Sequence, residues 1–423
     1  MSVAVVRGDA RALPLPGGSV DLVVTSPPYF GLRSYTDGGE HYGGQIGSEA
    51  SPREWLGSLL EATAEWVRVL KPGGSIFVNL GDKYAQDTER SRNGHSGSLA
   101  GTNPLRTGPS YTGRRDNGVP RKSLLGLPWR YALACIDDLG LILRAEIIWA
   151  KPNGLPESVT DRVRRAHEQV FHFTRQPRYY AAVDEIREDY SPNKPWGTNE
   201  RSGLKIGAAT AALRGTSISQ QQTGLGTAAS RTEHPLGKLP GSVWDIPSQP
   251  LTVPAHLGVD HFAAFPMELP RRIILGWSPP GICTTCGGGI RPVVDKTFDL
   301  DHIQHRNRPG FIDGAEPLGN LRGLNAEVRP NGRTLATITG YACACPQPGT
   351  LRPATVLDPF GGTGTTALVA GMHGRHGITV DRSADYCRLA AWRTTDPAQR
   401  AAALQVPKPP PVPDGQDALF AAP

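Results

Sequence analysis

A hydroxyl, two prolines and an aromatic ring follow an apolar run close to the start of the chain. Residues 20–24 read VDLVV, and residues 25–29 read TSPPY. The β-branched run predicts a buried strand of a parallel sheet, and the prolines end it because neither has a backbone N–H to donate. In such a loop the Ser26 hydroxyl and the Pro27 carbonyl can accept hydrogen bonds from an amino group, while Tyr29 stacks on a planar ring. Taken alone, the same five residues also fit an ordinary surface turn.

A second candidate site follows more than 300 residues later. Residues 354–357 predict a strand, residues 358–364 read DPFGGTG, and a helix from Thr365 leads into a strand that ends at Asp381. The glycines let the backbone approach a ligand, and a carboxylate at the tip of the next strand can accept both hydroxyls of a ribose. This is not the GxGxxG pattern of dinucleotide sites, and the Asp358 carboxylate disfavours a pyrophosphate. A nucleoside with a cationic tail fits the segment better.

The two motifs and their order resemble those of S-adenosylmethionine-dependent DNA amino-methyltransferases. Residues 358–364 look like motif I of that family, and residues 25–29 look like its motif IV, which holds the target amine. Residues 261–266 (HFAAFP) are similar to motif X, beside the methionine end of the cofactor. Weaker family blocks match at residues 8–9, 71–74, 147–156 and 167–168. The catalytic motif precedes the cofactor motif, which is the permuted order of the family's β-group.

The resemblance implies a fold class and a set of site residues. The fold is α/β, of the Rossmann-like methyltransferase type, with a doubly wound, mostly parallel sheet, a circularly permuted motif order and loop-rich insertions. The implied catalytic residues are Ser26, Pro27, Pro28 and Tyr29. The implied cofactor-binding residues are Asp9, Phe262, Asp358, Pro359, Phe360, Gly361, Gly362, Gly364, Thr365 and Asp381.

The reaction implied by the resemblance is transfer of a methyl group from S-adenosylmethionine to the N4 amino group of cytosine in duplex DNA. The base is flipped out, and the amine attacks the methyl group directly and in line. Ser26 stands where adenine enzymes of the family more often have Asp, which favours cytosine, and N6 of adenine is the alternative. Further alternatives are a methyltransferase of RNA or of a small molecule, and a catalytically silent DNA-binding subunit. The proline loop and the basic residues disfavour small substrates, and the intact Ser26 and glycine loop disfavour a silent subunit.

The positive charge of the chain is concentrated in one stretch. The formal net charge is +6 at pH 7, and residues 88–130 alone hold eight basic and two acidic side chains. Their Gly, Ser, Thr, Asn and Pro content predicts a loop that either closes over a DNA backbone or is a plain solvated linker. The expected phosphate contacts are Arg114, Arg115, Arg121 and Lys122. Double-stranded DNA is the expected partner, and a cognate restriction endonuclease is a second candidate.

Four of the six cysteines form two closely spaced pairs. Such pairs are typical of a four-thiolate zinc site, which we expect to be structural. The alternatives are four reduced thiols packed together, or a site in which His302 or His305 replaces one ligand. Cys135 and Cys387 fall in predicted helices and fit buried apolar positions. The expected zinc ligands are Cys283, Cys286, Cys343 and Cys345.

The elements between these motifs follow the alternation of strands and helices that is typical of a doubly wound sheet. A KPGG turn at residues 71–74 is expected to end the first helix, and Trp129, Leu133 and Ile136 recur on one face of the second. Helices are predicted at residues 52–70, 128–139, 266–276 and 365–372 and through Tyr386, Leu389 and Trp392. Strands are predicted at residues 3–6, 20–24, 75–80, 141–143, 146–149, 170–173, 354–357 and 377–380.

A chain of 423 residues is long enough for two or three domains. No run of eighteen apolar residues and no signal-peptide pattern is present, so a cytoplasmic protein is expected. The expected organisation is a catalytic half of the core (1–190), a target-recognition segment (191–240), a core helix with motif X (241–282), a zinc-binding insert (283–345), a cofactor-binding half of the core (346–400) and a disordered tail (401–423).

Overall fold

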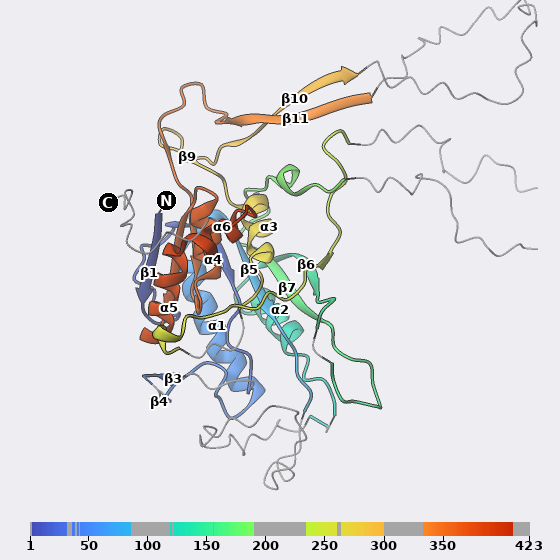
Figure 1. Ribbon diagram of the computed structural model, residues 1–423, viewed down its shortest axis with the longest axis vertical. Helices are drawn as coiled ribbons and strands as arrows, with labels where there is room; N and C mark the ends of the chain where they lie inside the picture. Colours follow the sequence, from blue (N-terminus) through green and yellow to red (C-terminus); the bar gives the residue numbers. More distant parts are fainter. Residues whose placement is uncertain are drawn as a thin grey trace, which may run out of the picture. The chain divides into compact units, whose positions relative to one another are not determined.

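An eight-stranded sheet runs through the main compact unit of the protein, which consists of Met1–Ile186, Gly241–Arg291 and Tyr341–Pro423 (Figure 1). The structure, a computed structural model, describes residues 2–31, 36–38, 40–41, 43–85, 119–120, 122–154, 156–189, 234–259, 264–299 and 333–408. Along the sheet the strands are β1 (Ser2–Arg7), β14 (His376–Asp381), β13 (Thr355–Asp358), β2 (Val20–Thr25), β5 (Leu70–Leu80), β7 (His167–Thr174), β6 (Ile142–Ala150) and β8 (Val243–Asp245).

The strand directions confirm a doubly wound, mostly parallel sheet. Each neighbouring pair from β1 to β5 is parallel, β7 runs antiparallel to both β5 and β6, and β8 is parallel to β6. The strands β13 and β14 come late in the chain but lie between β1 and β2, which come first. The permuted order therefore places β2 and β13, the two strands that carry the predicted motifs, side by side.

Alternating side chains of the strands build two hydrophobic clusters. In β5, Ile76 and Val78 belong to one cluster and Phe77 to the other, and in β13 the neighbours Leu357 and Val356 are divided in the same way. Because successive side chains of a strand point to opposite faces, the clusters cover opposite faces of the sheet. The first is completed by helices α1 (Pro52–Val69) and α2 (Leu127–Asp137), and the second by α3 (Glu268–Trp277), α4 (Thr365–Met372) and α6 (Pro397–Ala403).

The start of α1 follows from its sequence. The Ser51 hydroxyl accepts from the Glu54 backbone N–H at 3.2 Å, the Glu54 carboxylate accepts from the Ala50 N–H at 3.0 Å, and Pro52 occupies the first helical turn. Residues of the inner face, including Trp55, Leu59 and Trp66, are buried, as their spacing predicts. The remaining helix, α5 (Ala384–Thr395), contacts β1, β14 and α4.

The expected turn at residues 71–74 was wrong. Leu70, which caps α1, is already extended and pairs with Val20, so β5 includes the whole KPGG segment. A register shift between Val20 and Leu22 accommodates it. Gly74 is required there because a β-carbon at this position would lie 2.7 Å from the Asp21 carbonyl oxygen. The strands expected at 141–143 and 146–149 are likewise one strand, β6, with a bulge between Leu143 and Ala145.

The predicted inner face of α2 was also wrong. Trp129, Leu133 and Ile136 are 41%, 51% and 38% exposed, while Tyr131 and Cys135 are buried. The helix carries apolar side chains on both faces, so periodicity alone did not single out the face that packs. Tyr131 decides the orientation because its buried hydroxyl meets the Thr63 hydroxyl of α1 at 2.9 Å. Residues 127–130, which were counted with the basic loop expected at residues 88–130, form the first turn of α2.

Smaller elements complete the described chain. Short strand pairs are β3 (Thr36–Asp37) with β4 (Glu40–His41), and β9 (Ile282–Cys283) with β12 (Leu351–Arg352). A second compact unit, Arg187–Pro240 with Pro292–Gly340, contains most of the pair β10 (Arg291–Asp299) and β11 (Arg333–Ala342). The helix α6 includes the first residues of the tail that was expected to be disordered. None of the helices in the described ranges has the length and apolar content needed to cross a membrane.

Replacement of Gly377 by Ala tests the close packing of α4 on β14. A β-carbon at Gly377 would lie 2.4 Å from the Ala367 carbonyl oxygen, so helix and strand must separate. We expect Gly377→Ala to cost roughly 1–3 kcal/mol. The matched control is Gly57→Ala on the exposed face of α1, where nothing lies within 4 Å of the added carbon. It should stabilise by about 0.5–1 kcal/mol. Thermal unfolding of both variants checks this, and an equal response of the two would contradict it.

Candidate active site

The two predicted loops line one cavity at the carboxyl edge of the sheet. Its volume is about 190 Å³, and its wall includes Ser26, Pro27, Pro28 and Tyr29 from the loop after β2. The loop after β13 contributes Pro359, Phe360, Gly361, Gly362, Thr363 and Thr365, and the end of β14 contributes Asp381. Ligands of open α/β sheets bind at this edge, so the topology brings the two sequence motifs to one site.

A buried hydrogen bond joins the two loops. The Thr25 hydroxyl, at the end of β2, donates to Asp358 Oδ1, at the end of β13, at 2.7 Å. The same carboxylate accepts from the Thr366 hydroxyl of α4 at 2.9 Å and from the Phe360 backbone N–H at 3.1 Å. Asp358 is 1% exposed and is not among the residues of the cavity wall. Its carboxylate holds protein groups in place at the base of the site, whereas the sequence predicted a contact with the ligand.

Burial raises the pKa of Asp358 to about 6, although donors surround its carboxylate. Asp381 lies near and also has a raised pKa because of its burial, which the backbone N–H groups of Ser383 and Gly362 offset in part. The raised values mean that the folded protein binds these protons more tightly than the unfolded chain does.

The loop after β2 belongs to a polar cluster that was only partly predicted. The Tyr29 hydroxyl donates to Glu168 Oε2 at 2.7 Å, and the Ser26 hydroxyl lies 3.2 Å from the Tyr29 oxygen. Asn79, near the end of β5, brings its amide nitrogen to 2.7 Å from Glu168 Oε2, 2.9 Å from Tyr29 and 3.3 Å from Ser26. The Lys151 ammonium pairs with Glu168 Oε1. Every one of these side chains lines the cavity.

The charge of Glu168 is fixed by its neighbours. Burial would raise the pKa of its carboxyl, but the Lys151 ammonium and the hydrogen bonds from Lys151, Tyr29 and Asn79 outweigh it and lower the pKa below the ordinary value. Glu168 is therefore ionised at neutral pH. An ionised carboxylate only accepts, which fixes the Tyr29 hydroxyl as a donor to it.

The loop itself is held by its surroundings. The Trp55 indole N–H donates to the Pro28 carbonyl at 3.0 Å. One edge of the Tyr29 ring lies against Gly81, where any β-carbon would come within 2.7 Å of the ring. These contacts fix the loop that the two prolines stiffen.

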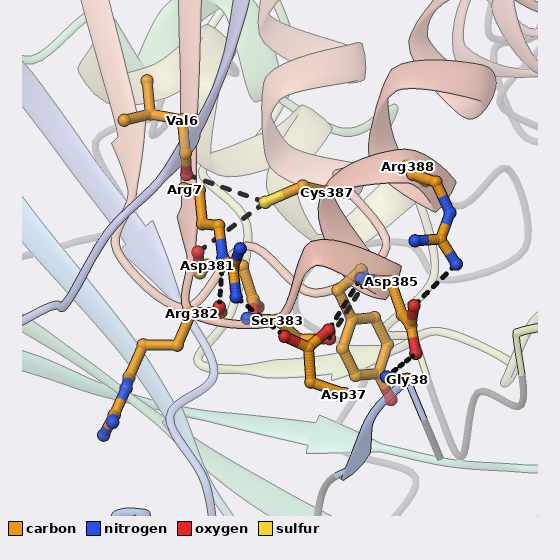
Figure 2. A network of polar contacts seen from close by, with 11 residues as sticks. Val6, Arg7, Asp37, Gly38, Asp381, Arg382, Ser383, Asp385, Cys387 and Arg388 are labelled. Carbon is orange, nitrogen blue, oxygen red and sulfur yellow. Dashed lines mark hydrogen bonds and ion pairs between the residues drawn. The ribbon is translucent and has the colours of Figure 1, made fainter. Parts of the chain in front are cut away.

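Asp381 lines the same cavity and is fixed by two backbone donors. Its carboxylate accepts from the Gly362 N–H and from the Ser383 N–H, each at 2.9 Å. Figure 2 shows how Asp37, from the β3–β4 hairpin, lies beside this turn and the start of α5. Asp37 Oδ1 accepts from the Ser383 hydroxyl at 3.3 Å and from the Asp385 N–H at 3.2 Å, and Asp37 Oδ2 accepts from Arg7 at 2.9 Å.

The predicted residue Asp9 lines the cavity, where it is paired with a basic neighbour. Arg11 donates to both oxygens of its carboxylate, at 3.1 Å and 2.9 Å, and lowers the pKa of Asp9. Arg382 lies 3.7 Å from the same carboxylate. The cavity wall therefore carries both acidic and basic groups on this side.

Several predicted residues cannot be placed at the site. Phe262, Arg114, Arg115, Arg121, His302 and His305 lie outside the described residues. The neighbours of Phe262 that are described, Ala264 and Phe265, line the cavity. Lys122 is exposed and forms an ion pair with Asp161. Gly364, in the left-handed conformation, is the cap of α4 and packs against Ala390 of α5.

Asn79 was missed by the sequence analysis, and Lys151 and Glu168 were noted only as parts of weak family blocks. The available signal was a polar side chain in an apolar strand. Asn79 is 4% exposed in the run SIFVNL, and a buried amide of this kind needs partners. Those partners come from β7 and from the loop after β2, which no local pattern connects to the end of β5.

The four predicted zinc ligands lie together in the main unit. Their sulfur atoms all lie within 4.8 Å of one another, and three pairs are 3.8, 3.2 and 3.3 Å apart. Four sulfurs at about 2.3 Å from a tetrahedral zinc would be about 3.8 Å apart, so the donor set fits the ion. Backbone N–H groups of Gly288, Cys345 and Gly349 point to the sulfurs of Cys286, Cys343 and Cys283, each at 3.4 Å. Cys135 is buried and Cys387 is half-buried, away from this cluster.

The raised pKa of Asp358 predicts a pH-dependent stability. A group that binds its proton more tightly when folded stabilises the folded state below its unfolded pKa, and this contribution is lost as the pH rises through about 6. Asn cannot titrate, so the stability of the wild type relative to Asp358→Asn should fall between about pH 4 and pH 7, by on the order of 1–3 kcal/mol. Thermal unfolding across this range measures it, with the exposed Asp137→Asn as control. A stability difference that is the same at every pH would contradict the assignment.

Comparisons with known proteins agree with this arrangement. The family described as DNA methylase, of the N6/N4 type, matches residues 20–285 and 349–391, which is more than half of the chain. The type II methyltransferase M.XycI of Xanthomonas campestris pv. cyanopsidis is 41% identical over 76% of this chain and 88% of its own length. M.Cfr9I of Citrobacter freundii is 32% identical over the same shares.

Among solved structures, the PvuII DNA methyltransferase (cytosine-N4-specific) aligns with 94% of this chain and 87% of its own, with 17% identity and a TM-score of 0.48. The family match and the two relatives are decisive, and they agree with the motifs and with the sheet order. The chain therefore belongs to the N6/N4 DNA methylase family and is a type II DNA methyltransferase.

Proposed function

We propose that this type II methyltransferase transfers a methyl group from S-adenosylmethionine to the N4 amino group of cytosine in duplex DNA. The observation that carries the proposal is one cavity whose wall contains the Ser26–Tyr29 loop, the glycine loop after β13 and Asp381 at the end of β14. One loop offers acceptors for an amine, and the other offers a carboxylate for a ribose. Methylation of N6 of adenine is the second candidate, because both bases present an exocyclic amine to the same acceptors.

The residues of the cavity suit S-adenosylmethionine. Gly361 and Gly362 leave the wall without side chains next to Asp381, and Phe360 offers an apolar face. The cofactor supplies a methyl group on a positively charged sulfur. Asp381 would accept from the ribose hydroxyls, and Phe360, Gly361 and Gly362 would line the adenosine. The family resemblance implies that Phe262 also contacts the cofactor.

The hydrogen-bond directions around Ser26 favour its proposed role. Tyr29 donates its proton to Glu168, so its oxygen is left to accept from the Ser26 hydroxyl. Ser26 Oγ then presents a lone pair to an N–H of the target amine, and the Pro27 carbonyl would take the second N–H. Accepting both protons draws the amine nitrogen towards tetrahedral geometry and frees the lone pair that attacks the methyl group. Tyr29 and Pro28 would hold the flipped base.

The same contacts offer a route for the surplus proton. When the amine nitrogen bonds the methyl carbon, the carbon–sulfur bond breaks towards sulfur and the nitrogen carries one proton too many. A proton accepted by Ser26 Oγ can be matched by transfer of the Ser26 proton to Tyr29 and of the Tyr29 proton to Glu168 Oε2. Lys151 keeps Glu168 ionised before transfer, so the last acceptor is ready.

The preference for cytosine depends on one residue. Ser26 is the first catalytic residue of the proline motif, where adenine enzymes of the family more often carry Asp. We propose further that Arg114, Arg115, Arg121 and Lys122 contact DNA phosphates and that residues 191–240 read the target sequence. As a type II methyltransferase, the protein would protect its sites against a cognate endonuclease.

A product analysis tests the reaction. The protein is incubated with labelled S-adenosylmethionine and with DNA, RNA or no nucleic acid, and the products are digested to nucleosides. We expect label on deoxycytidine and none with RNA. Label on deoxyadenosine would select the second candidate, and no label on any nucleoside would refute the proposal.

Ser26→Ala separates the roles of the two loops. Loss of one positioned acceptor should slow methyl transfer at saturating cofactor by about 10²-fold. The dissociation constant for S-adenosylmethionine should stay within about twofold, because a lost contact that acts only in the transition state leaves ground-state binding unchanged. Rapid-quench transfer rates and calorimetric binding measure the two effects, with Ser19→Ala, outside the cavity, as the control. Loss of cofactor binding in Ser26→Ala would show that the roles are assigned wrongly.

We also propose that Cys283, Cys286, Cys343 and Cys345 bind a structural zinc ion. The ion would connect the segments on either side of the long insertion between Cys286 and Cys343, and the cluster does not line the catalytic cavity.

Metal analysis of the purified protein should give one zinc per chain. Cys286→Ser removes one of four thiolates and should lower the zinc content and the thermal midpoint together. Cys387→Ser, a cysteine outside the cluster, should keep the full zinc content. A wild-type protein with four free thiols and no zinc would contradict the assignment.

A further inference from the structure

The connection between β6 and β7 leaves the cavity wall and returns to it. Lys151, directly after β6, and Glu168, the second residue of β7, both line the cavity. The Lys151 N–H donates to the Ala166 carbonyl at 2.7 Å, which closes the base of the loop. All residues of this loop except Leu155 are described. The loop therefore lies at the rim of the cavity, at the carboxyl edge of the sheet.

Both ends of the loop are braced against neighbouring segments. Near its start, the Asn153 amide donates to the Ser248 carbonyl at 3.0 Å and accepts from the Ser248 N–H at 2.7 Å. Near its end, the Arg162 guanidinium lies 3.9 Å from the centre of the Tyr84 ring. The same guanidinium donates to the Val163 carbonyl at 3.1 Å. The backbone around Val163 is therefore held in place by the body of the protein.

The side chain of Val163 extends into solvent from this braced backbone. It is 85% exposed, whereas the other exposed large apolar side chains in the described ranges are 38–57% exposed. A single exposed apolar residue is ordinary on a protein surface. Val163 differs by its place, because it lies three residues from the base of a fixed loop beside the cavity.

Positive charge surrounds this valine. Residues 162–165 read RVRR. Arg162 and Arg165 are partly buried and lie 2.6 Å and 3.6 Å from carboxylates. Arg164 is exposed beside Val163, and its guanidinium donates to a backbone carbonyl at 2.6 Å. An apolar side chain next to an exposed cation suits duplex DNA, which has an apolar base stack between two anionic backbones.

The proposed reaction creates a gap that such a side chain can fill. Ser26 and Tyr29 lie in the cavity wall, and an exocyclic amine inside a stacked duplex cannot reach them. Once the target base has left the duplex, the bases on either side of it lose a stacking partner. An apolar side chain that enters the stack replaces part of the lost contact and hinders the return of the base.

We propose that Val163 inserts into the base stack of duplex DNA at the place that the flipped base leaves, while Arg164 contacts a neighbouring phosphate. This inference rests on the proposed transfer to a flipped base. Val163 is then a positioning residue, since it touches neither the amine nor the methyl donor and acts on the fraction of target base that is outside the duplex.

Two duplexes that differ in the cost of flipping test the insertion. The base that the wild type methylates is mapped on DNA of mixed sequence, and a short duplex of that sequence is prepared. In one form the target base is paired, and in the other it lies opposite an abasic site, so that it leaves the stack more easily. Val163→Ala should slow transfer to the paired duplex roughly tenfold at saturating DNA and cofactor. Transfer to the unpaired target should slow by less than about twofold.

Single-turnover rates measure both effects, with Val406→Ala, half exposed at the end of α6, as the matched control. Val163→Leu keeps an apolar side chain and should keep the rate on the paired duplex within about twofold. Circular dichroism and binding of S-adenosylhomocysteine establish that each variant is folded. Equal slowing on both duplexes would mean that Val163 only supports the loop. No slowing on the paired duplex would leave Val163 to solvent or to a second copy of the chain. Either result overturns the inference.

A charge variant tests the position of the loop on the DNA. Arg164→Gln should weaken binding to both duplexes and lower the slope of log affinity against log salt by about 1, because one phosphate contact is lost. Arg388→Gln, exposed on α5, is the matched control. A salt dependence equal to that of the wild type would remove the loop from the DNA backbone and would also overturn the inference.

The wild type separates this inference from the proposed function. A wild-type protein that transfers no label to DNA would refute the proposed reaction and the insertion with it. Normal transfer by the wild type, with equal rates for Val163→Ala on the paired duplex, would refute the insertion alone.

Discussion

One hydrogen bond between residues that are 333 positions apart holds the site together. Thr25, at the end of β2, donates to Asp358, at the end of β13, and the same carboxylate accepts from the first turn of α4 and from the loop between. Because the two strands are neighbours, the bond fixes the position of the loop after β2 relative to the loop after β13. In-line transfer requires such a fixed separation, since reacting atoms must be held at roughly 3–3.5 Å. Asp358 is thus more useful buried than it would be in contact with a ligand.

Buried charges in the cavity wall and next to it are stabilised in three ways. Glu168 is paired with Lys151, and Asp381 accepts hydrogen bonds from backbone N–H groups. The Arg393 guanidinium donates hydrogen bonds to threonine hydroxyls. The ion pair keeps the Glu168 carboxylate ionised, and the backbone donors partly offset the effect of burial on the pKa of Asp381. The hydrogen bonds of Arg393 stabilise a cation that is not exposed to solvent. Acidic and basic potentials at separate parts of one wall suit a ligand that carries both signs of charge.

The sequence predicted the strands and helices correctly where the apolar or polar character of each side chain matches its burial in the structure. The apolar runs became β2, β13 and β14, and the glycine loop became the start of α4. The failures have a common origin in tertiary contacts. The KPGG segment was taken for a turn because its local chemistry favours one, but pairing of Leu70 with Val20 made it a strand. The orientation of α2 depended on Tyr131 meeting Thr63, which no pattern within the helix contains. The site shows the same division: the loop residues were predicted as site residues, while Asn79, Lys151 and Glu168 were not.

The permuted motif order illustrates why the residues that the sequence analysis did not single out are those that lie outside the two loops. The cavity needs β2 and β13 as neighbours, and it is indifferent to which comes first in the chain, because only the carboxyl edge of the sheet meets the ligands. Loop residues carry their chemistry in their own sequence, so they can be recognised wherever they occur. The roles of Glu168 and Arg393 depend instead on the side chains that contact them. Glu168 accepts from Tyr29, and Arg393 donates to Thr363. These contacts form only when the sheet is folded, so the roles can be inferred only once the strand order is known.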